Sequence, residues 1–556
     1  MFATFFLLLL HFCDATGLEG DVPAHSAAVR SKDCIIVGGG AIGLAAALTL
    51  SNPPHGYNVK VLEKTENTYQ YDPTMAYHYN LNPRGLAWCD TIPKVSVKVE
   101  ERGLFATDGG FANVIVPGFP LTPIPAARKM FRLMQGLRRK SCFIQRHTLL
   151  ILLHESCLEQ ERDRSETKNE SVGSIEVLNS KVFESMDSDE SGVLVVKCGD
   201  GSTYSASLVV AADGIESSVR SCLTDKTKSG WLQSKKGKLA LRKYKSPSTG
   251  LRVKTLKFPP GMRVPNTTDS SMVMEATTFY NFRSLNNGCR NKLSLSCFPM
   301  RSSKTIRPAI SVTRPDHEVW LYRNGSAIKQ FYEKSFPRIN FDNIMNDKEW
   351  DDFAKSNGIT FPFCQYSSGS AVSSPWRDTG VVLLGDACHA FPPDAGQGVN
   401  AGFQDIIALD RALRGQDIIS GRAAVKPVKK LLLGDALEAY ERNRGPEHKA
   451  LIQLALSFAP YQYRQSWRRD RAGAMLWAIN AQIRMLLNKF TFGLFPPPVF
   501  IICQNHNMTF RQVMRRANLG TLCLQLISCF ALLMIISKRF VPAWTWSALG
   551  LMVIRD

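Results

Sequence analysis

The feature that most constrains this fold is a glycine-rich turn between a short apolar strand and an apolar helix. The strand is Cys34–Val37, and the Ala-rich helix continues through Leu50. The turn between them reads Gly38-Gly39-Gly40-Ala41-Ile42-Gly43. Gly38 permits a tight turn, Gly40 lets the backbone approach a pyrophosphate, and Gly43 lets helix and strand pack closely. The pattern predicts a Rossmann-like unit in an α/β fold, in which the whole turn lies against a bound nucleotide.

A second apolar strand, Val59–Leu62, ends in an acid, Glu63, 20 residues after Gly43. A carboxylate at this place can hold the ribose of an adenine dinucleotide. Strand, glycine turn, helix, strand and acid in this order favour dinucleotide binding over a structural glycine cluster. They do not separate FAD from NAD.

A third apolar strand, Leu208–Ala212, ends in Asp213-Gly214 and so repeats the pairing of an acid with a glycine. Earlier in the chain, the helical spacing from Leu149 onward places Arg146 at the start of a helix. Arg146 is interpreted either as a contact to the cofactor or as a surface arginine near a helix N-terminus.

The stretch from Val381 to Asp405 combines strand, loop and helix, and reads VVLLGDACHAFPPDAGQGVNAGFQD. In order it carries the strand end Gly385-Asp386, the loop prolines Pro392 and Pro393, and the helix start Gly396-Gln397-Gly398-Val399-Asn400. An acid at a strand end accepts hydrogen bonds from hydroxyls, and free N–H groups at a helix start face negative charge. The stretch therefore suits a polyol-bearing, partly anionic cofactor. Taken alone, it also fits an ordinary strand-to-helix turn.

Composition narrows the class of protein. The 556 residues are 44% hydrophobic and 21% charged, which predicts a globular chain of two or three domains. The formal net charge of +20 suits anionic membranes, nucleic acid or acidic substrates, or merely a soluble surface, and the sequence contains no nucleic-acid-binding module. The 14 cysteines form no C-x-x-C pair, so most are expected to be buried thiols and no metal site is predicted.

Both ends of the chain carry apolar segments. Phe5–Leu10 resembles the core of a signal peptide, but no basic residue precedes it, so a weakly membrane-seeking N-terminus is the alternative. Leu519–Ser537 is uncharged, flanked by basic residues and long enough to predict a membrane helix. A buried helix or an in-plane anchor are the alternatives. Phe540–Ile554 is predicted to return into the interface or to make a second, short membrane contact.

The middle of the chain gives a coarser picture. Residues 155–173 are predicted to be an exposed loop, and the basic stretch Asp225–Arg263 a solvated insertion or a surface for an anionic partner. A sheet-and-helix substrate lid is predicted from the β-type runs Val273–Phe279, Leu293–Phe298 and Val319–Tyr322 and a helix near Ser326–Phe336. Leu437–Phe495 is predicted to form long helices broken near Pro446 and Pro460.

Taken in order, these motifs resemble those of the single-component FAD-dependent aromatic hydroxylases, and the C-terminal third looks most like the kynurenine 3-monooxygenases among them. The resemblance covers roughly Asp33 to Ile536. It rests on the glycine turn with Glu63, on Arg146, on Asp213-Gly214 and above all on GDACHAFPPDAGQGVNAGFQD, a long and specific match. Fainter matches are NLNPRG at 80–85, NGSAIKQFYEKSFP at 324–337 and MTFRQVMRRA at 508–517.

The resemblance implies a monooxygenase that uses FAD, NAD(P)H and O2 to hydroxylate a small aromatic molecule. It implies that Glu63 binds the FAD ribose, that Arg146 and Asp213 help to hold the cofactor, and that Asp386 contacts the ribityl chain. The helix start at 397–400 would aim N–H groups at the flavin N1 and C2 carbonyl. The full set of implied cofactor-binding residues is Gly38, Gly40, Ala41, Ile42, Gly43, Glu63, Arg146, Asp213, Gly214, Gly385, Asp386, Gly398, Val399 and Asn400.

Four residues are expected nearest the chemistry by the same resemblance. These are Pro392, which with Pro393 would stiffen the loop beside the reacting face, and Gly396, Gln397 and Asn400. His389 is expected to be a packed structural histidine, because the reaction needs no side-chain base there.

The domain layout implied by the resemblance follows the motifs. A Rossmann-like FAD-binding domain is followed by an inserted β-sheet substrate domain and a helical, membrane-anchored C-terminus. The expected bounds are a leader at 1–30, a discontinuous FAD-binding domain at 31–225 and 364–430, a lid at 226–363, a helical region at 431–515 and an anchor at 516–556. The expected location is the mitochondrial outer membrane or the endoplasmic reticulum.

Departures from the kynurenine-hydroxylating pattern bear on the substrate. The arginine expected after Ile92-Pro93 is missing, and Ala439 replaces an expected asparagine. A tyrosine is expected near Gln504 or Asn505, where this chain has none. Loss of a bidentate arginine leaves a substrate carboxylate short by about 1.5 to 3 kcal/mol, and Lys94 or Lys98 could replace it only as a point charge. The hypothesis is therefore a related enzyme with a different, less polar substrate. The alternatives are a flavin monooxygenase acting on a quinone or sterol precursor, and a non-catalytic flavin- or prenyl-binding escort.

Overall fold

The computed structural model describes residues 32–540 apart from internal gaps. The gaps are 67–68, 70–76, 106–111, 116–121, 124–140, 227–238, 266–270, 286–292, 303, 343, 376, 420–430 and 464–467. The predicted leader at 1–30 and the last predicted membrane contact, beyond residue 540, lie outside the described residues.

A six-stranded sheet organises the nucleotide-binding part, with strand order β22, β23, β12, β1, β2, β8. Every neighbouring pair is parallel except β22 with β23. The strands are β1 (Asp33–Val37), β2 (Asn58–Leu62), β8 (Ile175–Leu178), β12 (Leu208–Ala211), β22 (Ala371–Ser373) and β23 (Gly380–Leu383). Val37 lies opposite both Leu62 and Ala211, and Ala211 lies opposite Leu383. The glycine turn and the two acid-bearing strand ends therefore meet at one edge of the sheet.

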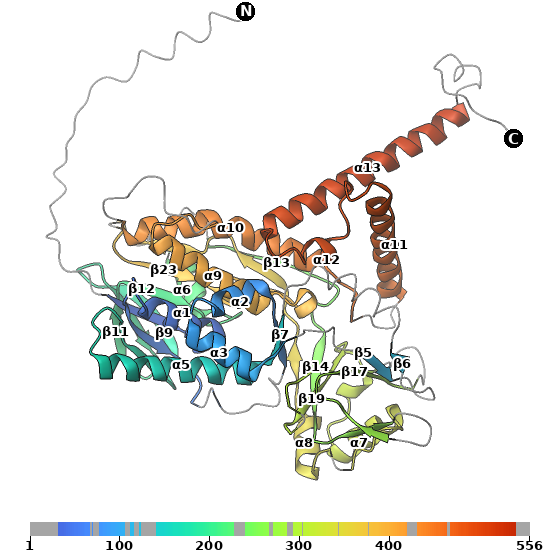
Figure 1. The fold of residues 1–556 in the computed structure, drawn as a ribbon, viewed down its shortest axis with the longest axis horizontal. Coiled ribbons are helices and arrows are strands. Elements are labelled where there is room, and N and C mark those ends of the chain that lie inside the picture. The colour runs from blue at the N-terminus through green and yellow to red at the C-terminus, as the bar shows by residue number, and fades with distance from the viewer. Residues whose placement is uncertain are drawn as a thin grey trace, which may run out of the picture. The chain divides into compact units, whose positions relative to one another are not determined.

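Alternate residues of this sheet enter two different cores, as the period of a strand requires. Ile36 and Val210 pack in a core with helices, while Ile35 and Val209 pack in a core with a second sheet. The helices of the first core are α1 (Ala41–Ser51), α5 (Arg146–Thr167), α9 (Gly398–Leu413) and α10 (Leu433–Ser457). The other core holds β9 (Phe183–Ser188), β10 (Leu194–Cys198), β11 (Thr203–Ala206) and α6 (Ser218–Lys226). Figure 1 shows α1 and α9 beside this sheet.

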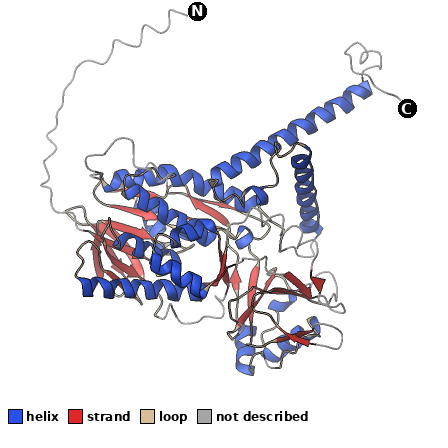
Figure 2. Ribbon diagram, in the orientation of Figure 1, coloured by secondary structure: helices blue, strands red, loops and turns tan. Residues whose placement is uncertain are grey.

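A seven-stranded sheet with two helices contains most of the stretch predicted to be a lid, together with β5 and β6 from earlier in the chain, and Figure 2 shows its strands as a group separate from the first sheet. Its role as a substrate lid remains a prediction. The strand order is β20 (Ile359–Thr360), β14 (Arg252–Phe258), β19 (Arg307–Thr313), β18 (Ser294–Cys297), β17 (Phe279–Arg283), β5 (Ala112–Ile115) and β6 (Thr122–Pro123). The helices are α7 (Gly325–Ser335) and α8 (Asp347–Lys355). An aromatic core around Tyr332, Phe341 and Trp350 joins helices and sheet.

The remaining elements connect these parts. They are β3 (His78–Leu81), α2 (Pro83–Cys89), α3 (Pro93–Arg102), β4 (Leu104–Phe105), β7 (Cys142–Gln145), β13 (Leu241–Tyr244), β15 (Arg263–Pro265), β16 (Ser271–Val273), η2 (Glu318–Trp320), β21 (Cys364–Ser367), η3 (Gly385–Ala387), β24 (His389–Ala390), η4 (Pro393–Ala395), α11 (Arg468–Phe490), α12 (Val499–Ile502) and α13 (Phe510–Phe540).

Two predictions of loop or helix break were wrong. The polar run from 155 is not a loop, because α5 continues to Thr167 with Leu153 and Cys157 buried on one face. Its charged residues lie on the other face, where Arg164 pairs with Glu161. Pro446 does not break α10, whose neighbouring residues Glu447 and His448 are buried.

Three predictions in the lid were also wrong in detail. Val319–Tyr322 is not a strand but contains most of the 3₁₀ helix η2, and within Val273–Phe279 only the two end residues are in strands, because residues 274–278 connect β16 to β17. Part of the basic stretch is not solvated, because β14 crosses the lid. Within β14, Lys254 is 3% exposed and lies 5.0 Å from the ring of Trp320.

The C-terminal region carries one helix, among those described, that is long and apolar enough to cross a membrane. This is the Phe510–Met534 part of α13, and only 11% of its most apolar window is buried. Its first turns pack against α10 and α12, with Phe510, Val513 and Ala517 buried. The cysteines of the described part are all free and mostly buried, as predicted.

Candidate active site

The glycine turn is shaped by two close approaches. At Gly38, where φ is +108°, a Cβ would lie 2.4 Å from Ala212 O, and at Gly43 a Cβ would lie 1.9 Å from Gly38 O. Neither position has room for a side chain. Between them, Ala41 is buried and Ile42 packs against Gly385 and Gly402. The turn therefore touches the later strand end directly.

Glu63 closes the turn from the neighbouring strand. Its Oε2 accepts a hydrogen bond from Gly39 N at 2.7 Å, and its Oε1 accepts from the backbone N and hydroxyl of Thr65 at 3.0 and 2.8 Å. The side chain is 8% exposed. Each carboxylate oxygen has two lone pairs, so Glu63 can also accept from a ribose hydroxyl.

Asp213 has an acceptor to offer. Its Oδ2 accepts from Val219 N at 3.1 Å, while its Oδ1 is buried without a hydrogen-bond partner in the described part of the chain. Burial raises the pKa of its carboxyl. Arg220, in the helix α6 that follows Asp213, donates to Ile215 O at 2.8 Å and to Ala387 O at 2.5 Å. Arg220 thereby ties the Asp213 strand end to the Asp386 strand end.

Asp386 lies in η3 at the end of β23, after Gly385, whose φ is +56°. The side chain of Asp386 is exposed, yet the surrounding chain raises the pKa of its carboxyl by burial. Arg146 starts α5 and donates its backbone N–H to Tyr77 O at 2.9 Å. Burial raises the pKa of Tyr79 well above its ordinary value, an effect that the charge of Arg146 opposes and the charge of Asp386 adds to.

The proline loop and the start of α9 are fixed by amides. Asn400 Oδ1 accepts from Asn82 N at 2.9 Å, and Asn400 Nδ2 donates to Asn80 O at 2.9 Å. Gln397 Oε1 accepts from Asn82 Nδ2 at 3.0 Å. The side chains of Asn400 and Gln397 therefore position the start of α9. A ligand would meet the backbone around Gly396 at this place. Pro392 and Val399 are buried.

A buried network centred on Asp405 supports the Asp386 turn from below. Asp405 Oδ1 accepts from Arg444 at 2.6 and 2.9 Å and from His448 Nε2 at 3.0 Å, and Asp405 Oδ2 binds His389 Nε2 at 2.7 Å and Gly385 N at 3.0 Å. Burial lowers the pKa of His448 to about 4, so its Nδ1 can accept from the thiol of Cys388, 3.3 Å away. The guanidinium of Arg444 and the imidazoles hold the pKa of Asp405 well below its usual range, against the opposing effect of burial. His389, Asp405 and His448 lie close enough for a metal, but Arg444 already neutralises the carboxylate.

The residues of this site fit a flavin dinucleotide, because several glycines leave space beside the backbone and two acids have carboxylate oxygens that can still accept hydrogen bonds. A Cβ at Gly40, Gly214, Gly396 or Gly398 would meet nothing within 4 Å. Gly40, Gly214, Asp213 and Asp386 follow the ends of three neighbouring strands of the sheet, whereas Gly396 and Gly398 lie at the start of α9. Backbone that a ligand can approach, next to carboxylates that can accept from hydroxyls, is what a polyol-bearing cofactor needs.

Arg84 joins this site to the C-terminal region. It is 3% exposed and donates to the carbonyls of Cys503 at 3.2 Å, Asn505 at 3.3 Å and Met508 at 3.0 Å. Its guanidinium also lies 4.9 Å from the ring centroid of Phe510. Arg84 lies two residues after Asn82, which donates a hydrogen bond to Gln397. Arg84 therefore holds the turn before α13 close to the start of α9.

The two lysines considered as replacements for an arginine lie elsewhere. Lys94 pairs with Asp163, and Lys98 pairs with Glu159 at 2.8 Å, both on α5. Ala439 is partly buried in the helical core. The structure therefore gives no cationic partner from α3 to a substrate carboxylate.

Several residues with a role at this site were missed from sequence. Arg220, Asp405, Arg444, His448 and Arg84 were not among the predicted site residues. Asp405 lies in the quoted motif and Arg444 in a Tyr-x-x-x-Arg pattern, so charged residues within apolar helical spacing were the available signal. Arg84 gave no such signal, because its partners lie more than 400 residues later.

A known family and several known proteins match long stretches of this chain, including residues 165–454 and 88% of its length. The profile of a family described as "FAD binding domain" matches residues 165–454, more than half of the sequence. A kynurenine 3-monooxygenase of Salinispora arenicola is 23% identical over 504 residues, covering 88% of this chain and 91% of that protein. The FAD-dependent monooxygenase olcE of Penicillium canescens is 24% identical over 453 residues, covering 78% and 81%. Among solved structures, P. aeruginosa PqsL in complex with 2-aminobenzoylacetate aligns with a TM-score of 0.46 and 19% identity, covering 80% of this chain and 99% of that one.

Proposed function

Because this chain belongs to the family of FAD-dependent aromatic hydroxylases and is a monooxygenase, we propose that it uses NAD(P)H and O2 to hydroxylate an aromatic substrate of low polarity. The observation that supports this most is the meeting of the glycine turn, Asp213 and Asp386 at one sheet edge. An escort without catalysis, considered from sequence, does not agree with membership of this enzyme family.

The residues proposed to hold FAD follow from the geometry of that edge. Glu63 would accept from the adenosine ribose, Gly40 would let the backbone meet the pyrophosphate, and Asp386 would accept from the ribityl hydroxyls. Arg146 and the free oxygen of Asp213 would hold the middle of the cofactor. FAD, when bound, supplies hydride acceptance from NAD(P)H and the activation of O2.

The chain's own part in the chemistry is to position and to stabilise charge. The N-terminus of α9 presents N–H groups of 398–400 to an anionic ring edge. The amides of Gln397 and Asn400 keep that helix start in place. Pro392 and Pro393 restrict the loop that would border the reacting face. His389 donates its Nε2 hydrogen to Asp405 and is proposed to support the Asp386 turn rather than to move a substrate proton.

The substrate is proposed to lack the amino-acid carboxylate of kynurenine. Lys94 and Lys98 are engaged in ion pairs on α5, and no arginine follows Ile92-Pro93. A carboxylate buried without a cationic partner would bind weakly. A lipid such as a quinone or sterol precursor is the second candidate, favoured by the apolar length of α13 beside the site.

Membrane attachment through α13 is part of the proposal, at the mitochondrial outer membrane or the endoplasmic reticulum. Leu522, Leu526 and Phe530 are exposed along this helix, which suits lipid contact. A cytosolic catalytic part is proposed. Glycosylation of Asn324 in cells would contradict it, since that acceptor is modified only in the lumen.

The test is oxidation of NADH and NADPH by the purified, detergent-solubilised full chain across aromatic acids, aromatic amines and quinone or sterol precursors. We expect a yellow protein whose oxidation rate rises with an apolar aromatic ligand and whose product carries one added oxygen. Asp386→Asn should lose FAD affinity, whereas Asp410→Asn, in α9 and paired with His55, should keep it. A colourless protein that cannot be reconstituted with FAD would contradict the proposal, and efficient turnover of kynurenine would overturn the substrate class.

A further inference from the structure

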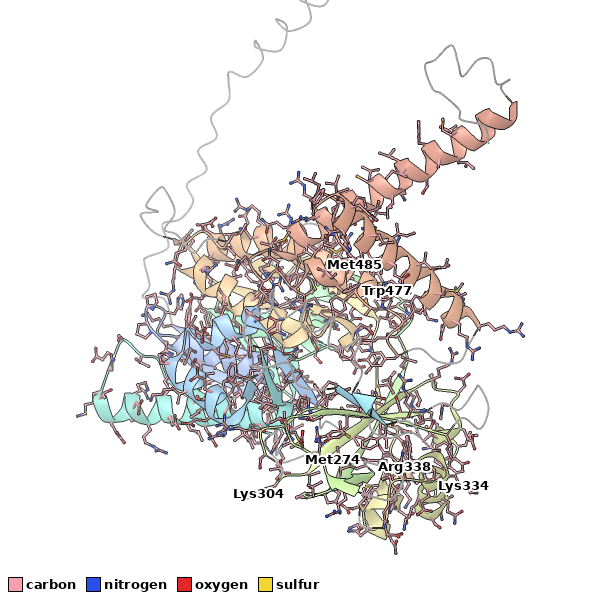
Figure 3. All side chains as sticks on the ribbon, turned by 45° about the vertical axis from the view of Figure 1, so that its right-hand side comes forward. Met274, Lys304, Lys334, Arg338, Trp477 and Met485 are labelled. Carbon is pink, nitrogen blue, oxygen red and sulfur yellow. The ribbon has the colours of Figure 1, made fainter. Side chains whose placement is uncertain are left out.

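The helix α11 turns its apolar side outward. Seven large apolar side chains on it are exposed: Met475 60%, Leu476 64%, Ile479 46%, Ile483 43%, Leu486 54%, Phe490 74% and Met485 37%. With 3.6 residues per turn, all of these positions except Met485 fall within about 100° of one another and form a single stripe. We call these six residues the α11 stripe. Figure 3 labels Trp477 and Met485 on the same helix.

The side of α11 opposite the stripe faces protein, and it is the polar side. Arg484 is 7% exposed and donates to Ala517 O at 3.3 Å and to Thr521 Oγ1 at 2.7 Å, both on α13. Trp477 donates its ring N–H to Ser457 O of α10 at 3.4 Å. A helix on the surface of a soluble protein usually buries its large apolar side chains, whereas α11 leaves the α11 stripe exposed and buries Arg484. Its stripe is therefore not built for contact with water.

The charges of α11 have one sign wherever they are exposed. The exposed charged residues are Arg468, Arg469, Arg471 and Lys489. The acid of this helix, Asp470, turns toward the lid and lies 3.6 Å from Arg314. An apolar stripe with basic residues at both ends matches the boundary between acyl chains and anionic headgroups.

The stripe is continuous with other apolar surface. Phe492 and Leu494, in the turn after α11, are 97% and 87% exposed. Through Arg484, α11 touches α13 next to Gly520, where the exposed apolar part of α13 begins with Leu519 and Leu522. Lipid that surrounds the exposed part of α13 would therefore also reach α11.

We propose that α11 lies in the surface of an anionic membrane, with the α11 stripe in the acyl chains and its basic residues among the headgroups. This second contact goes beyond the attachment by α13 and does not depend on catalysis. A second copy of the chain would have to match an all-positive rim with its own positive rim, which is unfavourable. The lipid surface is the occupant that fits both the stripe and the charge.

The test uses photo-crosslinking of the full-length chain. Benzoylphenylalanine is placed singly at Leu486, at Leu526 of α13, or at Lys334, an exposed polar position of α7, in vesicles of phosphatidylcholine and phosphatidylserine with a clickable acyl chain. We expect lipid adducts at Leu486 and Leu526, with a yield at Leu486 well above that at Lys334, because only a probe among the acyl chains is surrounded by C–H groups of lipid. Flavin absorbance of each variant reports separately on folding and on the proposed function.

Each other outcome counts against the inference. Adducts at Leu526 without adducts at Leu486 would overturn the α11 contact and leave the α13 anchor standing. A cross-linked dimer through Leu486 would assign the stripe to a second copy. Equal yields at Leu486 and Lys334 would show that α11 meets lipid only by collision and would also overturn it.

Discussion

The buried ion pair between Arg444 and Asp405 leads to a large and specific effect of one substitution. The guanidinium reaches Asp405 Oδ1 through two hydrogen bonds, at 2.6 and 2.9 Å, and Asp405 is fully buried. In Arg444→Met the carboxylate would keep its hydrogen bonds from His389, His448 and Gly385 N but lose its guanidinium. Removing one partner of a buried pair leaves an uncompensated charge, so we expect the free energy of unfolding to fall by about 3 to 5 kcal/mol.

The matched control lies one turn along the same helix. Asp410 pairs with His55 and Arg414, each at 2.8 Å, but its side chain is 21% exposed. Asp410→Asn should therefore cost less than about 1 kcal/mol. Both variants are compared by urea unfolding of the solubilised protein, followed by circular dichroism. The double variant Arg444→Met/Asp405→Asn should cost less than the sum of its single changes by about 2 kcal/mol. Additive costs, or equal costs for Arg444→Met and Asp410→Asn, would refute the reasoning.

Four further predictions concern the cofactor turn and the dependence of stability on pH. Gly40→Ala should leave folding intact, because its Cβ meets nothing within 4 Å, but weaken FAD binding at least about tenfold in a fluorescence titration. Gly43→Ala should abolish soluble protein, since its Cβ would lie 1.9 Å from Gly38 O. The pKa of His448 is lowered from 6.5 to about 4, so the unfolded chain binds the extra proton in that window and stability falls as pH drops, by about 1.4 kcal/mol per unit. The pKa of Asp394 is raised by burial from 3.8 to about 6, so the native state binds the extra proton and stability falls as pH rises through that range. In urea midpoints measured from pH 4 to 7, Asp394→Asn should steepen the loss on acidification and His448→Gln should reverse it, and unchanged slopes would contradict both assignments.

What could be predicted from the sequence was local in the chain. The turn at Gly38–Gly43, Glu63 and the strand ends at Asp213 and Asp386 are each written within a few residues, and parallel pairing brings their ends together. Roles for Gly396 and Asn400 in binding FAD remain predictions.

What could not be predicted depends on distant partners or on one-sided burial. Arg84 binds carbonyls from 419 to 424 positions away, and nothing near it in sequence marks that contact. The polar run beyond residue 155 was assigned to a loop because its charges were counted without the buried stripe through Leu153 and Cys157. Likewise, the helical spacing of apolar residues in α11 could not show that its leucines face outward. The spacing defines an apolar side of the helix but does not say which side packs against the protein.

The contacts of Arg84 have a consequence for how the protein is made. A chain is synthesised from its N-terminus, and early segments begin to fold while later ones are still absent. The glycine turn and Glu63 emerge first, but the turn that Arg84 grips, Cys503 to Met508, comes immediately before α13. The contacts that Arg84 makes next to Asn82 are therefore completed only after residues 503–508 have left the ribosome. Firm binding of FAD is expected only after that point in synthesis.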